Sequence, residues 1–249
     1  MKSLFSIQRI LRTPLKLSTK RYQSTNLLLD YDRFCDYLDE FYLKNKMKLD
    51  YSALSKNKEI VEPVVWELLR KEAEIISQKE PLMKPMINEA ILQQTSFKDA
   101  LIYRLATKMR GVLVSSDQWI KIFHDAHDIP QDDFQYDLVN AACLDLVAVK
   151  DRDPACDTLF TAFMFFKGYK ALQIYRVSHV LWREGRKELA SLLQSRTSEV
   201  FSVDIHPAAR IGRGLMIDHA SGLVVGETAV VGEHCSFLHG VTLVSALID

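Results

Sequence analysis

The last 49 residues of the chain, Phe201–Asp249, contain a repeat of apolar positions that governs the interpretation of the whole sequence. An α-helix has 3.6 residues per turn and cannot keep a period of six on one face, and a single strand alternates every two residues. A period of six is typical of a parallel β-helix, in which each short side points an apolar residue inward. Counted in sixes, the small or apolar positions are Ile205, Ile211, Ile217, Leu223, Ala229, Cys235, Val241 and Leu247. We therefore predict a β-helix over residues 201–243, with three hexads in each coil.

Upstream of this repeat, from about Asp30 to Glu199, the apolar residues recur with helical spacing. Pro63 suits a first helical turn, and Ser96 and Asp117 are the residue types that cap helix N-termini. The expected helices cover residues 61–80, 86–94, 96–109, 117–128 and 133–150. We expect an all-α domain over residues 59–200 that leads directly into the β-helix.

The stretch Leu159–Trp182 is apolar enough to resemble a membrane segment. Lys167, Gly168, Lys170, Arg176 and His179 interrupt it, and such polar residues are costly in a bilayer. We therefore interpret it as a buried pair of core helices, and we expect no membrane partner.

Charge is unevenly distributed along the chain, although the formal net charge is zero. Residues 1–29 hold six basic and no acidic residues, which leaves 26 basic and 32 acidic residues in the rest. The mildly acidic body disfavours nucleic acid as a partner. A basic, Ser/Thr-containing, acid-free leader is typical of a mitochondrial presequence, which we predict over residues 1–22; a basic tail on a cytoplasmic protein is the alternative. Residues 23–58 fit no pattern and are expected to be helical or partly disordered.

The four cysteines, Cys35, Cys143, Cys156 and Cys235, lack CxxC pairing and metal-ligand spacing. The sequence therefore predicts neither a disulfide nor a metal site.

Several segments together resemble the serine O-acetyltransferases, which are hexapeptide-repeat enzymes of cysteine biosynthesis. The resemblance covers residues 60–243 and rests on DRDPACD, DIHPAARIGRG, MIDHASG, VVGETAVVG and HGVTL. It implies an α-helical domain followed by a left-handed parallel β-helix, and a homo-oligomer based on trimers. It also implies transfer of an acetyl group from acetyl-CoA to the hydroxyl of L-serine, which gives O-acetylserine. No metal is expected to take part in this reaction.

The resemblance assigns the general base to His219 and its supporting carboxylate to Asp204. Histidine suits this role because its pKa lies near the working pH, and a carboxylate fixes its tautomer. With three hexads per coil, these two residues lie on the same side of neighbouring coils, offset by about three residues or roughly 10 Å. Spacing alone therefore does not establish the pair. A lone histidine at such a position is more often a surface residue.

The resemblance also assigns binding of the serine substrate to Asp153 and Asp218. Two carboxylates suit an ammonium group because charge-assisted hydrogen bonds are strong. The simpler interpretation of Asp153, before a proline, is a helix-start cap. His206 is expected to be structural. Turn glycines are expected at Gly212, Gly214, Gly222 and Gly226.

After HGVTL the sequence VSALID, residues 244–249, departs from the family pattern. Val244-Ser245 is what GTAAGT encodes, a common intron start, so we expect a translated intron and missing further coils. In the family those coils would supply most of the coenzyme A site, and a C-terminal tail would dock O-acetylserine sulfhydrylase. We therefore expect weak coenzyme A binding by this polypeptide and no docking of the sulfhydrylase.

Two functional alternatives remain open at this point. One is a non-catalytic subunit that oligomerises through its helical domain. The other is a different hexapeptide acetyltransferase acting on a sugar or a drug, which the long helical domain and DRDPACD disfavour.

Overall fold

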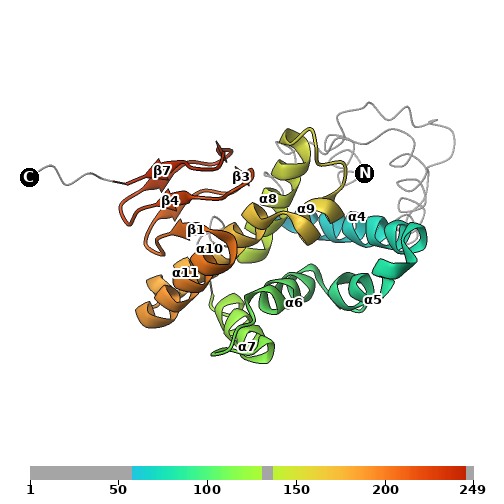
Figure 1. Ribbon diagram of the computed structural model, residues 1–249, viewed down its shortest axis with the longest axis horizontal. Helices are drawn as coiled ribbons and strands as arrows, with labels where there is room; N and C mark the ends of the chain where they lie inside the picture. The colour runs from blue at the N-terminus through green and yellow to red at the C-terminus, as the bar shows by residue number, and fades with distance from the viewer. Residues whose placement is uncertain (1–57, 131–136, 245–249) are drawn as a thin grey trace, which may run out of the picture.

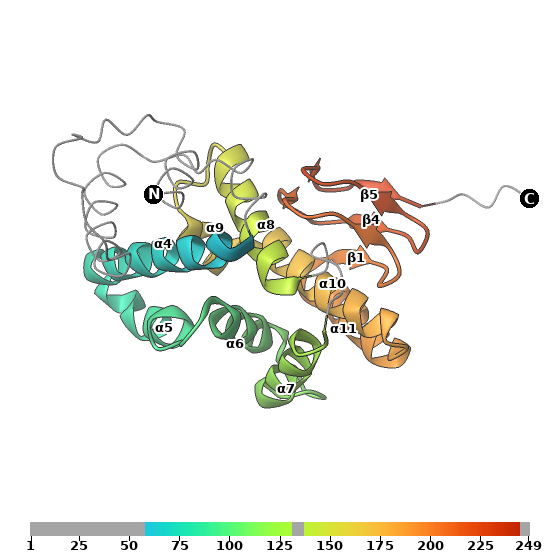
Figure 2. The same cartoon turned by 180° about the vertical axis from the view of Figure 1, so that it is seen from behind.

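A computed structural model describes residues 58–130 and 137–244, which form a helical region followed by a stack of short strands (Figure 1). The predicted presequence, nearly all of segment 23–58, and residues 245–249 lie outside the described residues. The strands lie at one end of the molecule above the last two helices, and the first helices lie toward the other end (Figure 2).

The helical region contains the helices that the apolar spacing predicts, with shifted bounds. Pro63 lies inside the first of them rather than in its first turn, and the predicted helix 86–94 is a short helix continued by a π turn. The helices are α4 (Lys58–Lys79), α5 (Lys84–Ile87), α6 (Phe97–Met109), α7 (Ser116–His127), α8 (Leu138–Arg152), α9 (Leu159–Phe165), α10 (Lys167–Arg183) and α11 (Lys187–Phe201), with a 3-10 turn at Pro81–Met83 and the π turn at Asn88–Leu92.

Two predicted helix caps have different outcomes. Ser96 caps α6 as predicted, and its side chain accepts a hydrogen bond from the amide of Asp99 at 3.1 Å. Asp117 was the wrong cap for α7. Ser115 caps that helix, because its hydroxyl reaches the amide of Gln118 while the Gln118 side chain bonds back to the Ser115 amide at 2.8 Å.

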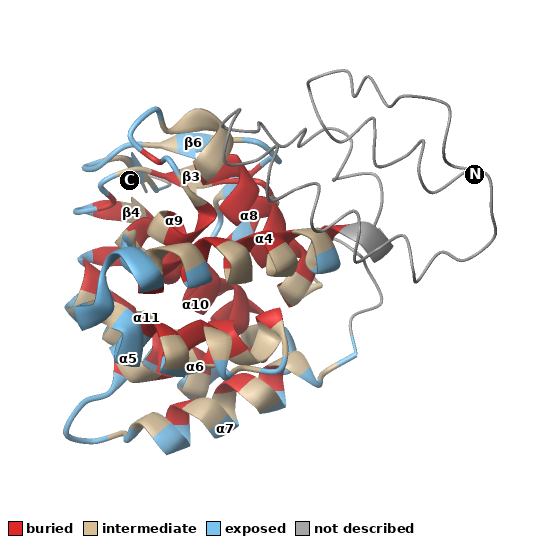
Figure 3. Cartoon of the chain, turned by 90° about the vertical axis from the view of Figure 1, so that its right-hand side faces the viewer, coloured by how far each residue is buried: buried red, intermediate tan, exposed pale blue. Residues whose placement is uncertain are grey.

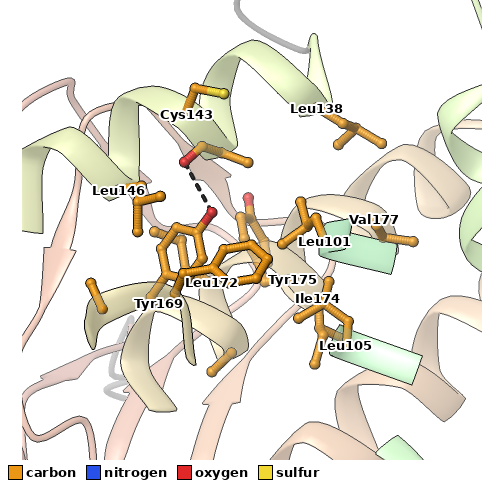
Figure 4. Packing of buried hydrophobic residues seen from close by; sticks show 14 of the residues in the cluster. Leu101, Leu105, Leu138, Cys143, Leu146, Tyr169, Leu172, Ile174, Tyr175 and Val177 are labelled. Atoms are coloured by element: carbon orange, nitrogen blue, oxygen red, sulfur yellow. Dashed lines mark hydrogen bonds between the residues drawn. The ribbon is translucent and has the colours of Figure 1, made fainter. Parts of the chain in front are cut away.

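The apolar stretch 159–182 forms two buried helices, as predicted. α9 and α10 are separated by a break at Phe166, and the Tyr169 hydroxyl donates to the carbonyl of Ala142 in α8 at 3.2 Å (Figure 4). Buried residues concentrate in α8 and α10 and in the facing sides of α4 and α6 (Figure 3). Within residues 58–130 and 137–244, no helix is both long and apolar enough to cross a membrane.

The strands form three parallel stacks, one for each side of a β-helix prism. The stacks are β1–β4–β7, β2–β5 and β3–β6, and all pairs are parallel. The strands are β1 (Val203–Ile205), β2 (Arg210–Ile211), β3 (Met216–Ile217), β4 (Leu223–Val225), β5 (Val230–Val231), β6 (Ser236–Phe237) and β7 (Thr242–Leu243). The chain turns at three corners per coil, which in the first coil are residues 206–209, 212–215 and 218–222.

The first coil is longer than three hexads, and this corrects the count in sixes. Val203 pairs with Leu223, 20 residues later, whereas Val224 pairs with Thr242, 18 residues later. Two additional residues therefore lie in the third corner of the first coil. The inward branched positions are Ile205, Ile211, Ile217, Val225 and Val231, which are 2–8 % exposed. The period of six looks unbroken across the two additional residues because each hexad has a second inward residue, two places before the branched one, such as Leu223 before Val225.

A buried ion pair joins the helical region to the first coil. Asp145 in α8 is fully buried, and Arg176 in α10 is 6 % exposed. Arg176 Nε and Nη2 donate to the two carboxylate oxygens at 2.7 and 2.9 Å, and Gln173 adds a further bond at 3.0 Å. The same carboxylate accepts from the amide of Leu215 at 2.9 Å, and Arg176 also donates to the carbonyl of Gly212 at 2.8 Å. The pair thus provides hydrogen-bond partners for the amide of Leu215 and the carbonyl of Gly212, both in the second corner.

Two other side chains of α10 bind the first corner. The Tyr175 hydroxyl donates to the carbonyl of Ala209 at 2.5 Å, and His179 Nδ1 donates to the carbonyl of Pro207 at 2.7 Å. Burial lowers the pKa of His179, which favours its neutral form. α10 is therefore fixed to the first coil over much of its length.

Gly168 marks the closest approach of α10 to the β-helix. A Cβ atom at this position would lie 2.0 Å from the carbonyl oxygen of Ile217, which is backbone and cannot rotate away. We expect Gly168→Ala to lower the free energy of unfolding by about 1–3 kcal/mol or more, as overpacking usually does. Urea unfolding checks this, with Gly232→Ala as the control because nothing lies within 4 Å of its added Cβ. Equal stability of the two variants would contradict the close approach.

Lys170 provides a test of pH dependence. Its side chain is 2 % exposed and donates to the carbonyl of Met164 at 3.1 Å. Burial, and then the positive charges of Arg104 and Lys108, lower the pKa of its amine to about 7. The unfolded chain has an ordinary lysine pKa near 10.5, so between pH 7 and 10 it binds more protons than the folded chain.

The stability of the protein should therefore rise with pH over this interval, by at most about 1.4 kcal/mol per pH unit. We expect Lys170→Gln to be more stable than the parent at pH 6.5 and to lose this advantage toward pH 9. Urea unfolding across pH measures this, and Lys121→Gln, at an exposed position of α7, is the control. Parallel stability curves for parent and Lys170→Gln would contradict the low pKa.

Candidate active site

The third corner of the first coil, residues 218–222, carries the two additional residues and two predicted site residues. His219 and Ala220 have φ angles of 56° and 61°, in the left-handed region that is uncommon for non-glycine residues. A tight turn closes around His219, with the Ala220 amide donating to the carbonyl of Asp218 at 2.6 Å. Such strained backbone persists where the surroundings hold it, and it occurs often at functional sites. Here it presents the His219 side chain to solvent, 71 % exposed.

Contacts from two sides hold this corner. The amide of Gly222 donates to the carbonyl of Ser202 at 2.7 Å, which ties the corner to the end of α11. On the other side, Lys167 Nζ at the start of α10 donates to the Ser221 hydroxyl. The corner is thus anchored by the helical region rather than by coil stacking alone.

His219 has a carboxylate and a second imidazole beside it. Its Nε2 lies 3.5 Å from Asp218 Oδ2, and its ring meets that of His239 at 5.8 Å between centroids, with an interplanar angle of 66°. His239 occupies the same corner one coil later and was missed by the sequence analysis. Its separation from His219 equals the length of the first coil, so the pairing becomes visible only once the 20-residue register is known.

Asp204 lies in β1, opposite Val224 of β4. Its Oδ1 accepts a hydrogen bond from Gln194 Nε2 of α11 at 2.7 Å, and no hydrogen bond or ion pair among the described residues joins it to His219. The 20-residue register places the two residues five positions apart rather than three. The pairing of Asp204 with His219 as carboxylate and base stays a prediction.

Asp153 ends a helix instead of starting one. Its amide donates to the carbonyl of Val149 at 2.9 Å, so it is the C-cap of α8. Its Oδ1 accepts from the amide of Ala155 at 2.8 Å, which is a local turn of the kind that aspartate side chains commonly form. The second carboxylate oxygen has no partner in the described structure.

Contacts in the described structure join two of the four predicted site residues, Asp218 and His219. Asp153 follows Arg152, whose guanidinium binds the second corner at Gly214, whereas His219 lies at the third corner. Five residues of extended chain separate these corners, about 16 Å. No hydrogen bond or ion pair among the described residues joins Asp153 to Asp218 or His219.

The remaining candidates are structural. His206 Nδ1 accepts from the amide of Ala208 at 3.1 Å, and its ring stacks edgewise on Trp182 at 5.0 Å, as expected for a structural residue. Cys143, Cys156 and Cys235 are free thiols. Among the described residues no group of three or more His, Cys, Asp or Glu side chains could hold a metal ion.

An exposed imidazole beside a carboxylate and a second imidazole suits chemistry on a substrate that approaches from solvent. Such an imidazole can accept a proton, the carboxylate can attract a cation, and the second ring can donate a hydrogen bond to developing negative charge. The arrangement is therefore suited to transfer of a group onto the hydroxyl of a small cationic molecule.

Comparisons with known proteins show which family this chain resembles. Residues 65–174, which run from α4 into α10, match the family described as serine acetyltransferase, N-terminal. The chain is 44 % identical over 181 residues to serine acetyltransferase 4 of Arabidopsis thaliana, covering 72 % of this chain and 49 % of that protein. It is 42 % identical over 179 residues to the mitochondrial serine acetyltransferase 3 of the same plant, covering 72 % and 44 %. The chain thus spans about half the length of these curated relatives.

Solved structures show the same likeness. The soybean serine acetyltransferase complexed with serine superposes with a TM-score of 0.68 at 41 % identity, covering 73 % of each chain. A serine acetyltransferase in complex with CoA superposes with a TM-score of 0.69 at 38 % identity, covering 73 % of this chain and 75 % of that one. Both likenesses include the helical region and the β-helix, which in such proteins is left-handed.

Proposed function

This chain belongs to the serine acetyltransferase family, and from that premise we propose that it transfers the acetyl group of acetyl-CoA to the hydroxyl of L-serine. The observation that carries the proposal is His219, an exposed imidazole held in a strained corner beside Asp218. Solved structures of similar proteins add support, because one is a complex with serine and another is a complex with CoA.

In the proposed reaction His219 accepts the proton of the serine hydroxyl as that oxygen attacks the thioester carbon. The carbonyl oxygen becomes negatively charged, and in this scheme His239, whose ring lies 5.8 Å from that of His219, donates a hydrogen bond to it. The carbon–sulfur bond then breaks, and the imidazolium returns its proton to the coenzyme A thiolate. Asp204 supports the imidazolium in this scheme, and Asp153 and Asp218 bind the serine ammonium.

The direct test is an assay of the purified chain for coenzyme A release from acetyl-CoA. At acetyl-CoA concentrations high enough to offset the weak coenzyme A binding expected above, we expect release to depend on L-serine and to be absent with an aminosugar acceptor. Release with the sugar and not with serine would favour the alternative of another hexapeptide acetyltransferase. No release, from a chain that still associates with its own copies, would favour the non-catalytic subunit.

We further propose that each site forms between two copies in a trimer. Arg152, the residue before Asp153, binds the second corner, and His219 lies at the third, so a neighbouring copy that presents its second corner to the third corner of this one would unite Asp153 with His219. Co-expression of Asp153→Asn and His219→Ala chains tests this, because some mixed oligomers then contain one site with both residues intact. We expect about a quarter of the parent activity from random mixing, against almost none for either variant alone. Mixed oligomers without recovered activity would contradict a shared site.

We also propose that residues 1–22 direct the chain to mitochondria. Their basic, acid-free composition supports this, as does the name of one relative. We expect a fluorescent fusion of the full chain to localise with mitochondria and the same fusion starting at residue 23 to remain outside them. Identical distribution of the two fusions would contradict the proposal.

A further inference from the structure

Arg152, the last residue of α8, binds two coils of the β-helix at once. Its Nη1 donates to the carbonyls of His234 and Cys235 at 2.8 and 3.2 Å and to the Ser236 hydroxyl at 2.8 Å. Its Nη2 donates to the carbonyl of Gly214 in the coil below. One guanidinium therefore crosses from the first coil to the second at the second corner.

The residue that follows Arg152 is Asp153, the carboxylate proposed to bind the substrate ammonium. Asp153 is rigid with respect to α8, because its amide bonds back to Val149 and its side chain closes a turn on Ala155. No hydrogen bond or ion pair of Asp153 reaches the β-helix in the described structure. Its position relative to the β-helix is therefore set by α8, which is bonded to the second corner through Asp145 at Leu215 and, at the residue next to Asp153, through Arg152.

Arg152 is not the main source of adhesion between the two regions. The buried pair of Asp145 and Arg176 lies between them, at 0 % and 6 % exposure. Most of the bonds of Arg152 are partly exposed, and a hydrogen bond in such a setting contributes about 1 kcal/mol or less to stability. Loss of Arg152 should thus displace Asp153 while it lowers the free energy of unfolding only a little.

We propose that Arg152 is a positioning residue for substrate binding, which fixes Asp153 over the second corner and so sets the affinity for the amino-acid substrate. This proposal rests on the proposed function. It predicts that the effect of Arg152 falls on the amino acid and not on acetyl-CoA, because only the amino acid carries the ammonium that Asp153 would bind.

The test compares Arg152→Gln, Asp153→Asn and the double variant in the full chain. We expect Arg152→Gln to raise KM for L-serine about tenfold, with kcat changed less than about threefold, KM for acetyl-CoA unchanged and Tm nearly unchanged. The double variant should be no worse than the worse single variant, because residues that act through one contact are not additive. Arg152→Lys should recover part of the affinity, because its ammonium can reach some of the same carbonyls.

The matched control is Arg196→Gln. Arg196 in α11 also donates to two backbone carbonyls, those of Met109 and Arg110 at 3.0 and 2.7 Å, but within the helical region. It should leave both KM values unchanged. An unchanged KM for serine in Arg152→Gln, or additive losses in the double variant, would overturn the proposal.

Calorimetric binding of L-serine without acetyl-CoA separates this inference from the proposed activity. A parent chain that binds serine without turning it over refutes the proposed activity. In that case the serine affinity of Arg152→Gln still tests the inference. Binding about tenfold weaker than the parent supports it, and equal binding refutes it. A parent chain that neither binds nor acetylates serine refutes both.

Discussion

Replacing His219 by alanine should lower turnover of L-serine and acetyl-CoA by about 10²–10⁴-fold, which is the usual contribution of a general base. The side chain is 71 % exposed, and its ion-pair and ring contacts among the described residues are with Asp218 and His239, so its removal should leave the fold unchanged. Initial rates measure the loss, and circular dichroism with thermal unfolding checks the fold. Asp204→Asn should lower turnover less, because it removes support for the base and not the base.

His234→Ala is the matched control for this variant. His234 is also an exposed histidine at a corner, with a left-handed φ of 63°, but it lies at the second corner of the second coil. The two substitutions therefore make the same change of side chain on similar backbone. Near-normal turnover in His219→Ala, or equal losses in both variants, would mean that the base has been wrongly assigned.

Replacing Asp145 by asparagine should lower the free energy of unfolding by about 3–5 kcal/mol. The carboxylate is fully buried and is the counter-ion of Arg176, whose guanidinium would be left as a buried charge facing an amide. Asparagine also has one acceptor oxygen fewer, so it cannot serve Arg176, Gln173 and the amide of Leu215 together. Urea unfolding measures the loss.

A surface pair of similar length controls for this prediction. Arg213 Nε lies 2.7 Å from Glu233 Oε1, the same distance as between Arg176 Nε and Asp145 Oδ2, but Glu233 is 40 % exposed. Glu233→Gln should lower stability by about 1 kcal/mol or less, because solvent screens an exposed pair. Similar losses in the two variants would show that burial does not determine the energy of these pairs.

The sequence indicates the two-part architecture because both of its periods are local. Apolar residues at helical spacing predict α6 and α7 to within a few residues, and the period of six predicts a β-helix. The register of that β-helix does not follow from the period. Each hexad has two inward positions, two residues apart. A count in sixes can therefore move from one inward position to the other at the third corner and still meet an apolar residue. Only the pairing of Val203 with Leu223 reveals the longer coil.

The candidate site is harder to predict for a related reason. His219 and Asp218 are adjacent in the chain, and the motif around them identifies both. His239 and Arg152 act through contacts across coils or between regions, and such contacts depend on the register and on the packing of α8 against the prism. The role of Asp153 as a helix C-cap likewise depends on where α8 ends, which apolar spacing determines only approximately.

The two additional residues in the third corner also distinguish the corner that carries His219 from the regular β-helix scaffold. The second coil closes with 18 residues, so the prism itself does not require the two additional residues in the corner that carries His219. A shortened corner would bring the inward positions of both coils into a uniform six-residue phase. A hexapeptide prism of regular length could conversely receive this corner as a graft, together with a helix start that supplies Lys167 and Gly168 to hold it. The proposed base would in this sense be separable from the repeat that carries it.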